Sequence, residues 1–469
     1  MKSLLLSLTA KLALFLVSVG LGMGSYWAVS VLQGAPGSVA TSPSLDRRTF
    51  LHASSIILDA EPHLLAQTKS PVDVVSDALG TFLILQANGD IVRVAPELSG
   101  TSSATTYARL ADGSTDHRIG FGNLALHPNF LVKGATGCGR FYVVVAERAG
   151  ARRADFRPEF GEGAEDHQDV VYEYTVEDPL LREFRGTRRE LMRFSLTGRS
   201  NNVSGLAFDP SGFLYIGVGD GAGVAGGTGS ASRNASSLAN AYGKVLRIDP
   251  LGMNAANGQY GVPESNPFRL VTGALPELWA FGLRAPRNLS YDPFQRGLYI
   301  AERAGEAREK INLSLHGGEH FGWDLDRDRA KMNAASRARL AEIVTPPAVD
   351  LDLLSGAVAP TTGSLVYRGE QFPSLAGALL FAGHNGQLVA MRPGESGHGA
   401  ARLAKVDLNG FGGARFSGLR TGARGELVFL CEDGQVIEMR KSASLGTGGS
   451  RERSMFCGIA DRIDAGRAM

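Results

Sequence analysis

Residues 201–221 read NNVSGLAFDPSGFLYIGVGDG and contain the pattern that decides the fold. An apolar run is followed by a turn of the Asp-Pro-x-Gly type and then by a second apolar run that ends in glycines. Asp, Pro and Gly favour turns because each constrains or frees the backbone in its own way. The stretch therefore predicts two short strands joined by a tight connection.

Variants of this strand–turn–strand phrase recur along the chain: GFGNLALHP (120–128), NLSYDPFQRGLYI (288–300) and GLRTGARGELVFL (418–430). A further hairpin is predicted where Asn88-Gly89 separates two alternating apolar runs. Self-similarity of this kind indicates a repeated supersecondary unit. Six strand-rich units can be counted, near residues 81–94, 120–180, 200–250, 277–325, 355–395 and 410–440. Radial repetition of such units predicts an all-β, six-bladed β-propeller over about 75–440.

The composition agrees with many short strands and argues against nucleic acid as a partner. The chain has 469 residues and 60 glycines, placed mainly at turns between apolar runs. A formal net charge of +1 provides no field that would gather nucleic acid. Residues 35–74 are expected to form a linker, residues 441–469 a disordered tail, and the alanine-rich stretch 327–343 a short helix.

The N-terminus, residues 1–34, is expected to be a hydrophobic helix that serves as a signal peptide or a signal anchor. Two lysines precede Leu12–Val31, a run without charge that is long enough to cross a bilayer. The lysines orient this segment with its N-terminus in the cytosol, so the propeller would be exported to the periplasmic or extracellular side. The alternative is cleavage near Ser38-Val39-Ala40.

Three motifs that suggest other chemistry are better explained as loops or core. GAGVAG (221–226) fits G-x-G-x-x-G but is followed by more glycines rather than a helix. HGGEH (316–320) lacks the helical spacing of a zinc motif and is interpreted as a polar loop. Cys138, Cys431 and Cys457 make no disulfide framework, although a single Cys138–Cys431 bridge is conceivable.

Taken together, several phrases resemble the soluble quinoprotein glucose/sorbosone dehydrogenase family, the PQQ-dependent aldose dehydrogenase-like propellers. They occur in the family's order and are GFGNLALHPNF (120–130), SGLAFDPSGFLYIGVGDGAG (204–223), AYGKVLRIDP (241–250), ELWAFGLRAPRNLSYDP (277–293) and INLSLHGGEHFGWD (311–324). The resemblance implies a PQQ site at the mouth of the propeller, with a calcium ion bridging cofactor and protein.

Carried over residue by residue, the resemblance implies a changed site. The family's catalytic histidine corresponds to Asn202, which cannot act as a general base near neutral pH. Arg284 corresponds to an arginine that faces a cofactor carboxylate, and Arg415 to one of two late arginines. The family's cofactor lysine corresponds to Asn385.

The calcium segment of the family corresponds to Ala304, Gly305 and Glu309, with Lys310 next to them. Calcium prefers oxygen ligands, and an ammonium group beside its site replaces attraction by repulsion. The implied metal site is therefore doubtful on sequence grounds.

Two hypotheses remain open, and a third is less favoured. The chain is either a PQQ-dependent sugar dehydrogenase with a displaced base, for which His117, His320 and His384 are the candidates, or a propeller without redox chemistry. In the second case the mouth binds a carbohydrate-like or protein ligand. The third class is a calcium-dependent lactonase. It is less favoured because the acidic and asparagine residues that would bind its metal are not identifiable in this sequence.

Overall fold

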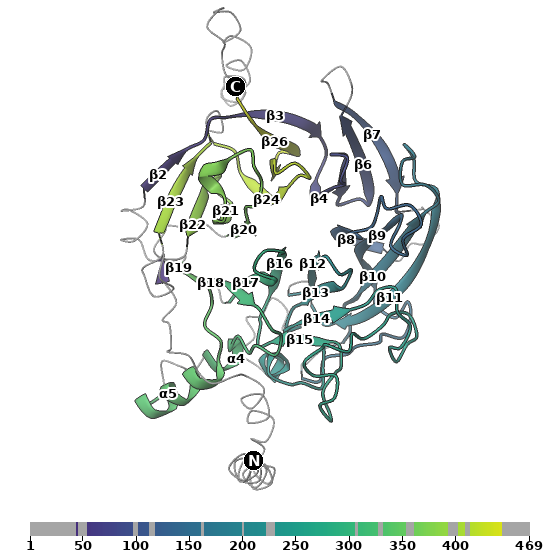
Figure 1. Ribbon diagram of the computed structural model, residues 1–469. Helices are drawn as coiled ribbons and strands as arrows, with labels where there is room; N and C mark the ends of the chain where they lie inside the picture. Colours follow the sequence, from purple (N-terminus) through teal and green to yellow (C-terminus); the bar gives the residue numbers. More distant parts are fainter. Residues whose placement is uncertain are drawn as a thin grey trace, which may run out of the picture.

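The computed structural model describes residues 44–45, 54–96, 102–111, 118–160, 164–198, 201–221, 230–304, 308–326, 332–352, 361–392, 402–408 and 413–442. These residues form six sheets arranged as blades around a central opening (Figure 1). The pairing is antiparallel throughout, except that β1 and β2 each join the edge of a sheet in parallel. The prediction of an all-β, six-bladed propeller is confirmed.

Each blade has four strands that follow one another from the channel outward, and two blades have a fifth strand at the outer edge. The blades are numbered in chain order. Blade 1 has β4 (Pro71–Ser76), β5 (Phe82–Gln86), β6 (Asp90–Pro96) and β7 (Ser102–Arg109). Blade 2 has β8 (Arg118–Leu126), β9 (Arg140–Arg148), β10 (His167–Val176) and β11 (Gly186–Leu196). Blade 3 has β12 (Val203–Phe208), β13 (Leu214–Val218), β14 (Lys244–Ile248) and β15 (Leu278–Phe281).

The remaining blades add strands from the N-terminal region. Blade 4 has β16 (Pro286–Asp292), β17 (Gly297–Arg303), β18 (Arg308–Ser314), β19 (Val349–Asp352) and β1 (Ser44–Leu45). Blade 5 has β20 (Thr361–Val366), β21 (Leu379–Gly383), β22 (Leu388–Arg392), β23 (Arg402–Asp407) and β2 (Ser54–Ile57). Blade 6 has β24 (Phe416–Thr421), β25 (Leu427–Cys431), β26 (Gln435–Lys441) and β3 (Ala60–Gln67).

The turn that follows the innermost strand is built by a side chain. In blade 3 the Asp209 Oδ1 atom accepts hydrogen bonds from the backbone N–H groups of Ser211 and Phe213. Gly212 follows with a φ of 90°, a left-handed conformation that favours glycine. Asp77 and Gly80 repeat this arrangement in blade 1. The repeated phrase in the sequence is therefore a repeated turn.

The ring is completed by a segment expected to be a linker. The strand β3 pairs antiparallel with β26, from Gln67 opposite Gln435 to Ala60 opposite Lys441. Within 35–74, the residues from 54 onward are thus largely strand. Sequence reasoning missed β3 because its exposed and buried positions do not alternate regularly, and its partner lies at the far end of the chain. The rest of 35–74 is outside the described residues, apart from β1.

The other local expectations have mixed outcomes. The Asn88-Gly89 hairpin connects β5 and β6, and the expected helix is α5 (Ala334–Ile343), whose N-cap is Asn333. The remaining helical turns are η2 (Ser230–Ala235), α4 (Trp323–Asp326) and η4 (Pro373–Leu375). Cys138 and Cys431 are both free, so the conceivable bridge between them is absent.

The two chain ends bear on localisation. No helix within the described ranges is long and apolar enough to cross a membrane. The predicted signal or anchor at Leu12–Val31 and the predicted tail from residue 443 onward both lie outside those ranges.

Candidate functional site at the channel mouth

The innermost strands of the blades begin at the same end of the channel, which we call the mouth. Hydrogen bonds join neighbouring inner strands: Asp73 Oδ2 accepts from the Leu124 N–H (3.0 Å), and Asn123 Oδ1 accepts from the Gly205 N–H (2.6 Å). Because the three inner strands of each blade pair antiparallel, the β17–β18, β21–β22 and β25–β26 connections also lie at this end.

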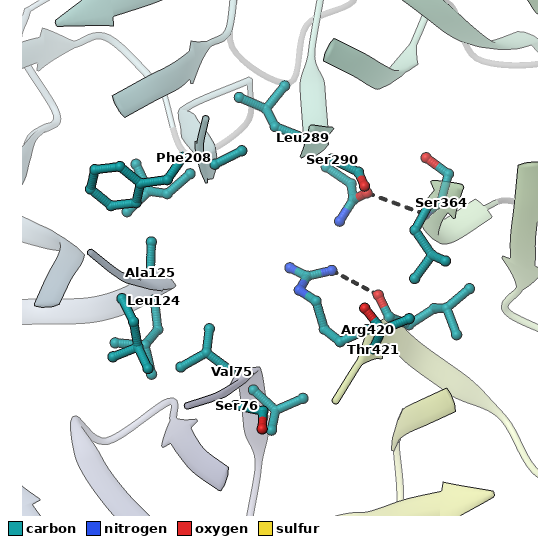
Figure 2. A pocket seen from close by; sticks show the side chains of 17 residues that line it. Val75, Ser76, Leu124, Ala125, Phe208, Leu289, Ser290, Ser364, Arg420 and Thr421 are labelled. Atoms are coloured by element: carbon teal, nitrogen blue, oxygen red, sulfur yellow. Dashed lines mark hydrogen bonds between the residues drawn. The ribbon is translucent and has the colours of Figure 1, made fainter. Parts of the chain in front are cut away.

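The channel itself is lined by inner strands from all six blades. A cavity of about 270 Å³ lies within it, with walls that include Leu124, Phe208 and Leu289. Figure 2 shows the Arg420 side chain extending into this opening, which serines and a threonine also line. Its guanidinium lies 2.9 Å from Asp73 Oδ1, which links blade 6 to blade 1 across the ring closure. An ion pair in the middle of the channel therefore holds the last blade to the first.

A second cavity, of about 310 Å³, lies at the mouth between blades 4, 5 and 6; we call it the mouth cavity. Its lining is strongly polar and consists of Arg287, Asn288, Ala301, Glu302, Arg303, Glu309, Thr361, Thr362, Gly363, His384, Ser417 and Glu432. The volume is at the lower end of the range for small-molecule sites. No aromatic side chain other than that histidine is among these residues.

Three of the sequence candidates lie at or beside the wall formed by blades 5 and 6. His384 Nε2 is 3.0 Å from one carboxylate oxygen of Glu432, and Arg415 Nε is 2.8 Å from the other. Asn385, beside that histidine, is exposed and accepts a hydrogen bond from the Gln387 N–H. Arg415 and Asn385 are therefore engaged locally, whereas His384 lines the cavity.

The opposite wall belongs to blade 4. Glu309, predicted near calcium, accepts hydrogen bonds at 2.6 Å from both the backbone N–H and the hydroxyl of Thr361. Burial raises the pKa of its carboxyl group, while these hydrogen bonds and the charges of Arg287 and Arg303 oppose that rise. Burial and the neighbouring Arg303 lower the pKa of the Arg287 guanidinium. Two cations thus share the cavity with this carboxylate.

The remaining calcium positions lie beside this wall. Lys310 is buried on β18, in register with Glu302 and Asp350 on the flanking strands. Ala304 is buried at the end of β17 and donates its N–H to the Arg308 carbonyl. Gly305 lies outside the described residues. Within the described part of the chain, no group of three His, Cys, Asp or Glu side chains could hold a metal ion.

Asn202 and Arg284 lie at the same end of the channel, beside the end of β13. The Asn202 carbonyl accepts from the Gly219 N–H, and the Arg284 carbonyl accepts from the next residue, Asp220. The Asn202 amide nitrogen is 3.1 Å from Nε2 of His167, a buried histidine. The position that the resemblance assigns to a base therefore contacts an imidazole.

Sequence reasoning did not single out His167. Its Nδ1 is 3.0 Å from Asp166, and its Nε2 is 3.4 Å from Asp169. Burial opposes protonation, but the two carboxylates outweigh it and raise the histidine's pKa. The signal that could have identified it is the sequence Asp166-His167-Gln168-Asp169, in which a histidine lies between two carboxylates.

Arg284 is nearly buried and stacks on an aromatic ring. Its guanidinium carbon is 4.9 Å from the centre of the Trp323 ring, and the Trp323 Nε1–H donates to Asp220 Oδ2. Its Nε atom is buried and has no hydrogen-bond partner among the described residues. An unpaired, buried guanidinium nitrogen at the mouth is a group that an anionic ligand could satisfy.

His320, a second displaced-base candidate, is not among the residues that line the mouth cavity. His320 is buried, accepts from the Gly322 N–H through Nδ1 and lies 3.2 Å from the Ser236 hydroxyl. Glu319 accepts the backbone N–H groups of Leu315 and His316, as expected for a polar loop. His117 lies outside the described residues.

The fold and its mouth define a class, the six-bladed propellers of the sugar dehydrogenase type, and comparison with known proteins identifies the family. The family model described as Glucose / Sorbosone dehydrogenase matches residues 68–438. The chain belongs to this family.

Named relatives include an aldose sugar dehydrogenase of Escherichia coli and an interacting protein. The chain is 28% identical over 250 residues to HIPL1 protein of Arabidopsis thaliana, covering 48% of this chain and 35% of that protein. It is 28% identical over 272 residues to Hedgehog-interacting protein of Mus musculus, covering 58% and 34%. The chain thus spans about a third of the length of these relatives.

Two solved structures have the same fold. The apo aldose sugar dehydrogenase of Escherichia coli has a TM-score of 0.58 and 17% identity, covering 81% of this chain and 99% of that one. The PQQ-bound form of aldose sugar dehydrogenase from Streptomyces coelicolor has a TM-score of 0.52 and 18% identity, covering 81% and 98%. At these identities the likeness concerns the fold.

Proposed function

We propose that this chain is an exported member of the family whose channel mouth binds a carbohydrate-like or protein ligand, and that the residues for PQQ and calcium chemistry are largely replaced. The observation that carries the proposal is the charge at the predicted calcium position. Glu309 shares the mouth cavity with Arg287 and Arg303, and its strand neighbour is the buried Lys310.

These residues do not fit a calcium ion. Calcium takes six to eight oxygen ligands, mostly carboxylates and carbonyls. One Glu309 carboxylate oxygen already accepts two hydrogen bonds from Thr361. The nearby guanidinium groups would repel a divalent cation, because like charges in a partly enclosed space are weakly screened. A cofactor that requires calcium as a bridge would lack that bridge here.

The expected PQQ contacts also differ. Asn385 cannot supply the positive charge of the family's lysine, and Arg415 is paired with Glu432. Asn202 lacks a titratable base, and general-base help is worth about 10²–10⁴-fold in rate. We therefore derive no oxidation step at this mouth.

The alternative is an active PQQ-dependent sugar dehydrogenase with a displaced base. Two observations favour it: His384 lines the mouth cavity beside a carboxylate, and the Arg284 Nε atom is buried without a partner. The names of relatives support both possibilities, since they include sugar dehydrogenases and an interacting protein.

An equilibrium titration separates the two. Purified protein is titrated with PQQ in the presence of Ca²⁺ and again with EDTA, while the absorption and fluorescence of the quinone are followed. We expect no saturable binding that depends on calcium. Tight binding abolished by EDTA would favour the dehydrogenase.

Export is proposed from the sequence of Leu12–Val31. Protease added to cells with a permeabilised outer barrier should digest the propeller while the cytoplasmic membrane is intact. A propeller protected until that membrane is lysed would contradict export. Association with membranes in high salt would indicate an anchor, and a soluble mature chain would indicate cleavage.

A further inference from the structure

The mouth cavity has two chemically different walls. Blade 4 contributes the cations Arg287 and Arg303 together with the carboxylates of Glu302 and Glu309, whereas blades 5 and 6 contribute His384, Glu432 and Thr362. Both blade 4 carboxylates already accept hydrogen bonds from the protein. A ligand that fills this space meets cationic donors on one side and an imidazole, a carboxylate and a hydroxyl on the other.

Arg287 has an unusual position in this cavity. Its side chain is exposed to the solvent of the cavity and makes no hydrogen bond or ion pair with any described residue. Arg303 and Arg284 both act on it as like charges, and Glu309 is the carboxylate that opposes them. That carboxylate is already hydrogen-bonded to Thr361. Arg287 therefore carries a positive charge that no described residue pairs by a hydrogen bond or an ion pair.

A guanidinium group is suited to a planar anion. It presents parallel N–H donors that match a carboxylate and form charge-assisted hydrogen bonds, about twice as strong as neutral ones. The other wall carries groups that recognise hydroxyls, since Glu432 is an acceptor and imidazole can donate or accept. A ligand that suits both walls would carry one anionic group and several hydroxyls. Oxidised sugars have this composition.

We propose that the mouth cavity binds a sugar acid without a metal ion, with its carboxylate on Arg287 and Arg303 and its hydroxyls toward His384 and Glu432. This inference rests on the proposed function, because it names the ligand class of the same site. A neutral aldose would leave the Arg287 charge uncompensated, and so it should bind more weakly.

The test is calorimetric titration of the full protein with three matched ligands: glucuronate, gluconate and glucose. At low salt, at least one acid should bind about tenfold or more tightly than glucose, because it adds a charge-assisted interaction. EDTA should leave the affinity unchanged, and 0.5 M NaCl should weaken it.

Variants locate the interaction. Arg287→Gln should weaken binding of the acid about tenfold or more and leave glucose nearly unaffected, while Arg287→Lys should give an intermediate affinity. The matched control is Arg182→Gln, an exposed arginine in the β10–β11 connection at the opposite end of the propeller, which should change nothing.

The possible results separate the two proposals. If acids and glucose bind equally and Arg287→Gln has no effect, the mouth still binds sugars but the sugar-acid inference is wrong. Inorganic phosphate binding as tightly as the acids would also overturn it, since the hydroxyls would then contribute nothing. If no sugar binds and PQQ does, both proposals fail.

Discussion

Among single residues, Asn202 has the greatest influence on the chemistry of the mouth. The resemblance assigns a base to this position, and the structure places its amide 3.1 Å from the buried His167. A histidine introduced here would meet a second imidazole, whose pKa the carboxylates of Asp166 and Asp169 already raise. A simple reversion therefore does not recreate an isolated neutral base.

We predict that Asn202→His yields no PQQ-dependent sugar oxidation and lowers stability by about 1 kcal/mol, the usual value of a lost hydrogen bond. Dye reduction with added PQQ and Ca²⁺ measures the first effect, and urea unfolding measures the second. Combining it with Lys310→Glu tests whether the cation site is also limiting. Appreciable turnover in the single variant would show that only the base had been lost.

His167 predicts a dependence of stability on pH. Its pKa in the folded protein is raised above the ordinary histidine value of 6.5, so the protonated form is favoured by folding. Its contribution is fully present below pH 6.5 and is lost as the pH rises through the folded pKa. The stability difference between the wild type and His167→Gln, from urea unfolding, should therefore be largest at acidic pH. A difference that grows with pH would contradict this.

At the scale of elements, the inner strands are joined by a ring of polar contacts. Asp73, Asn123 and Asn288 each accept a backbone N–H from the next blade. Between blades 6 and 1 the contact is instead the Arg420–Asp73 ion pair. Figure 2 shows the Arg420 side chain inside the channel, and Asn288 lines the same cavity.

Arg420→Met should destabilise the protein by about 2 kcal/mol, because it removes a charged partner from the buried Asp73 carboxylate. Thermal and urea unfolding measure the loss. The exposed Arg182→Met serves as the control and should change stability by no more than about 0.5 kcal/mol. Equal effects of the two substitutions would mean that the ion pair contributes little to ring closure.

The sequence predicted those elements whose turns are encoded locally. Asp209 and Gly212 make a blade turn through contacts within four residues, so the repeat was readable. The pairing of β3 with β26 depends on contacts across more than 360 residues, and no local pattern reveals it. The mouth cavity is similar, since Arg287 and His384 come from different blades and meet only in the closed ring.

At the scale of the whole molecule, the N-terminal strand β3 completes blade 6 beside the C-terminal β26 (Figure 1). Leu65 on this strand is 5% exposed and packs with Ile84 and Leu430, whereas its neighbour Leu64 is 51% exposed. Two adjacent leucines thus provide a test of ring closure with a built-in control.

Leu65→Ala should lower the free energy of unfolding by about 2–4 kcal/mol, through lost burial and the cavity left behind. Leu64→Ala should remain within about 0.5 kcal/mol of wild type. Urea unfolding followed by intrinsic fluorescence gives both values. Similar small effects at the two positions would show that β3 does not complete the ring in solution.

The central claim is that the mouth of this propeller is not a site of PQQ–calcium redox chemistry. The most direct measurement is dye-linked turnover of the wild-type protein with saturating PQQ, Ca²⁺ and a panel of aldoses. The account predicts no oxidation above the protein-free background. Robust turnover that requires both PQQ and Ca²⁺, and that is lost in His384→Asn, would contradict it and would establish the displaced base.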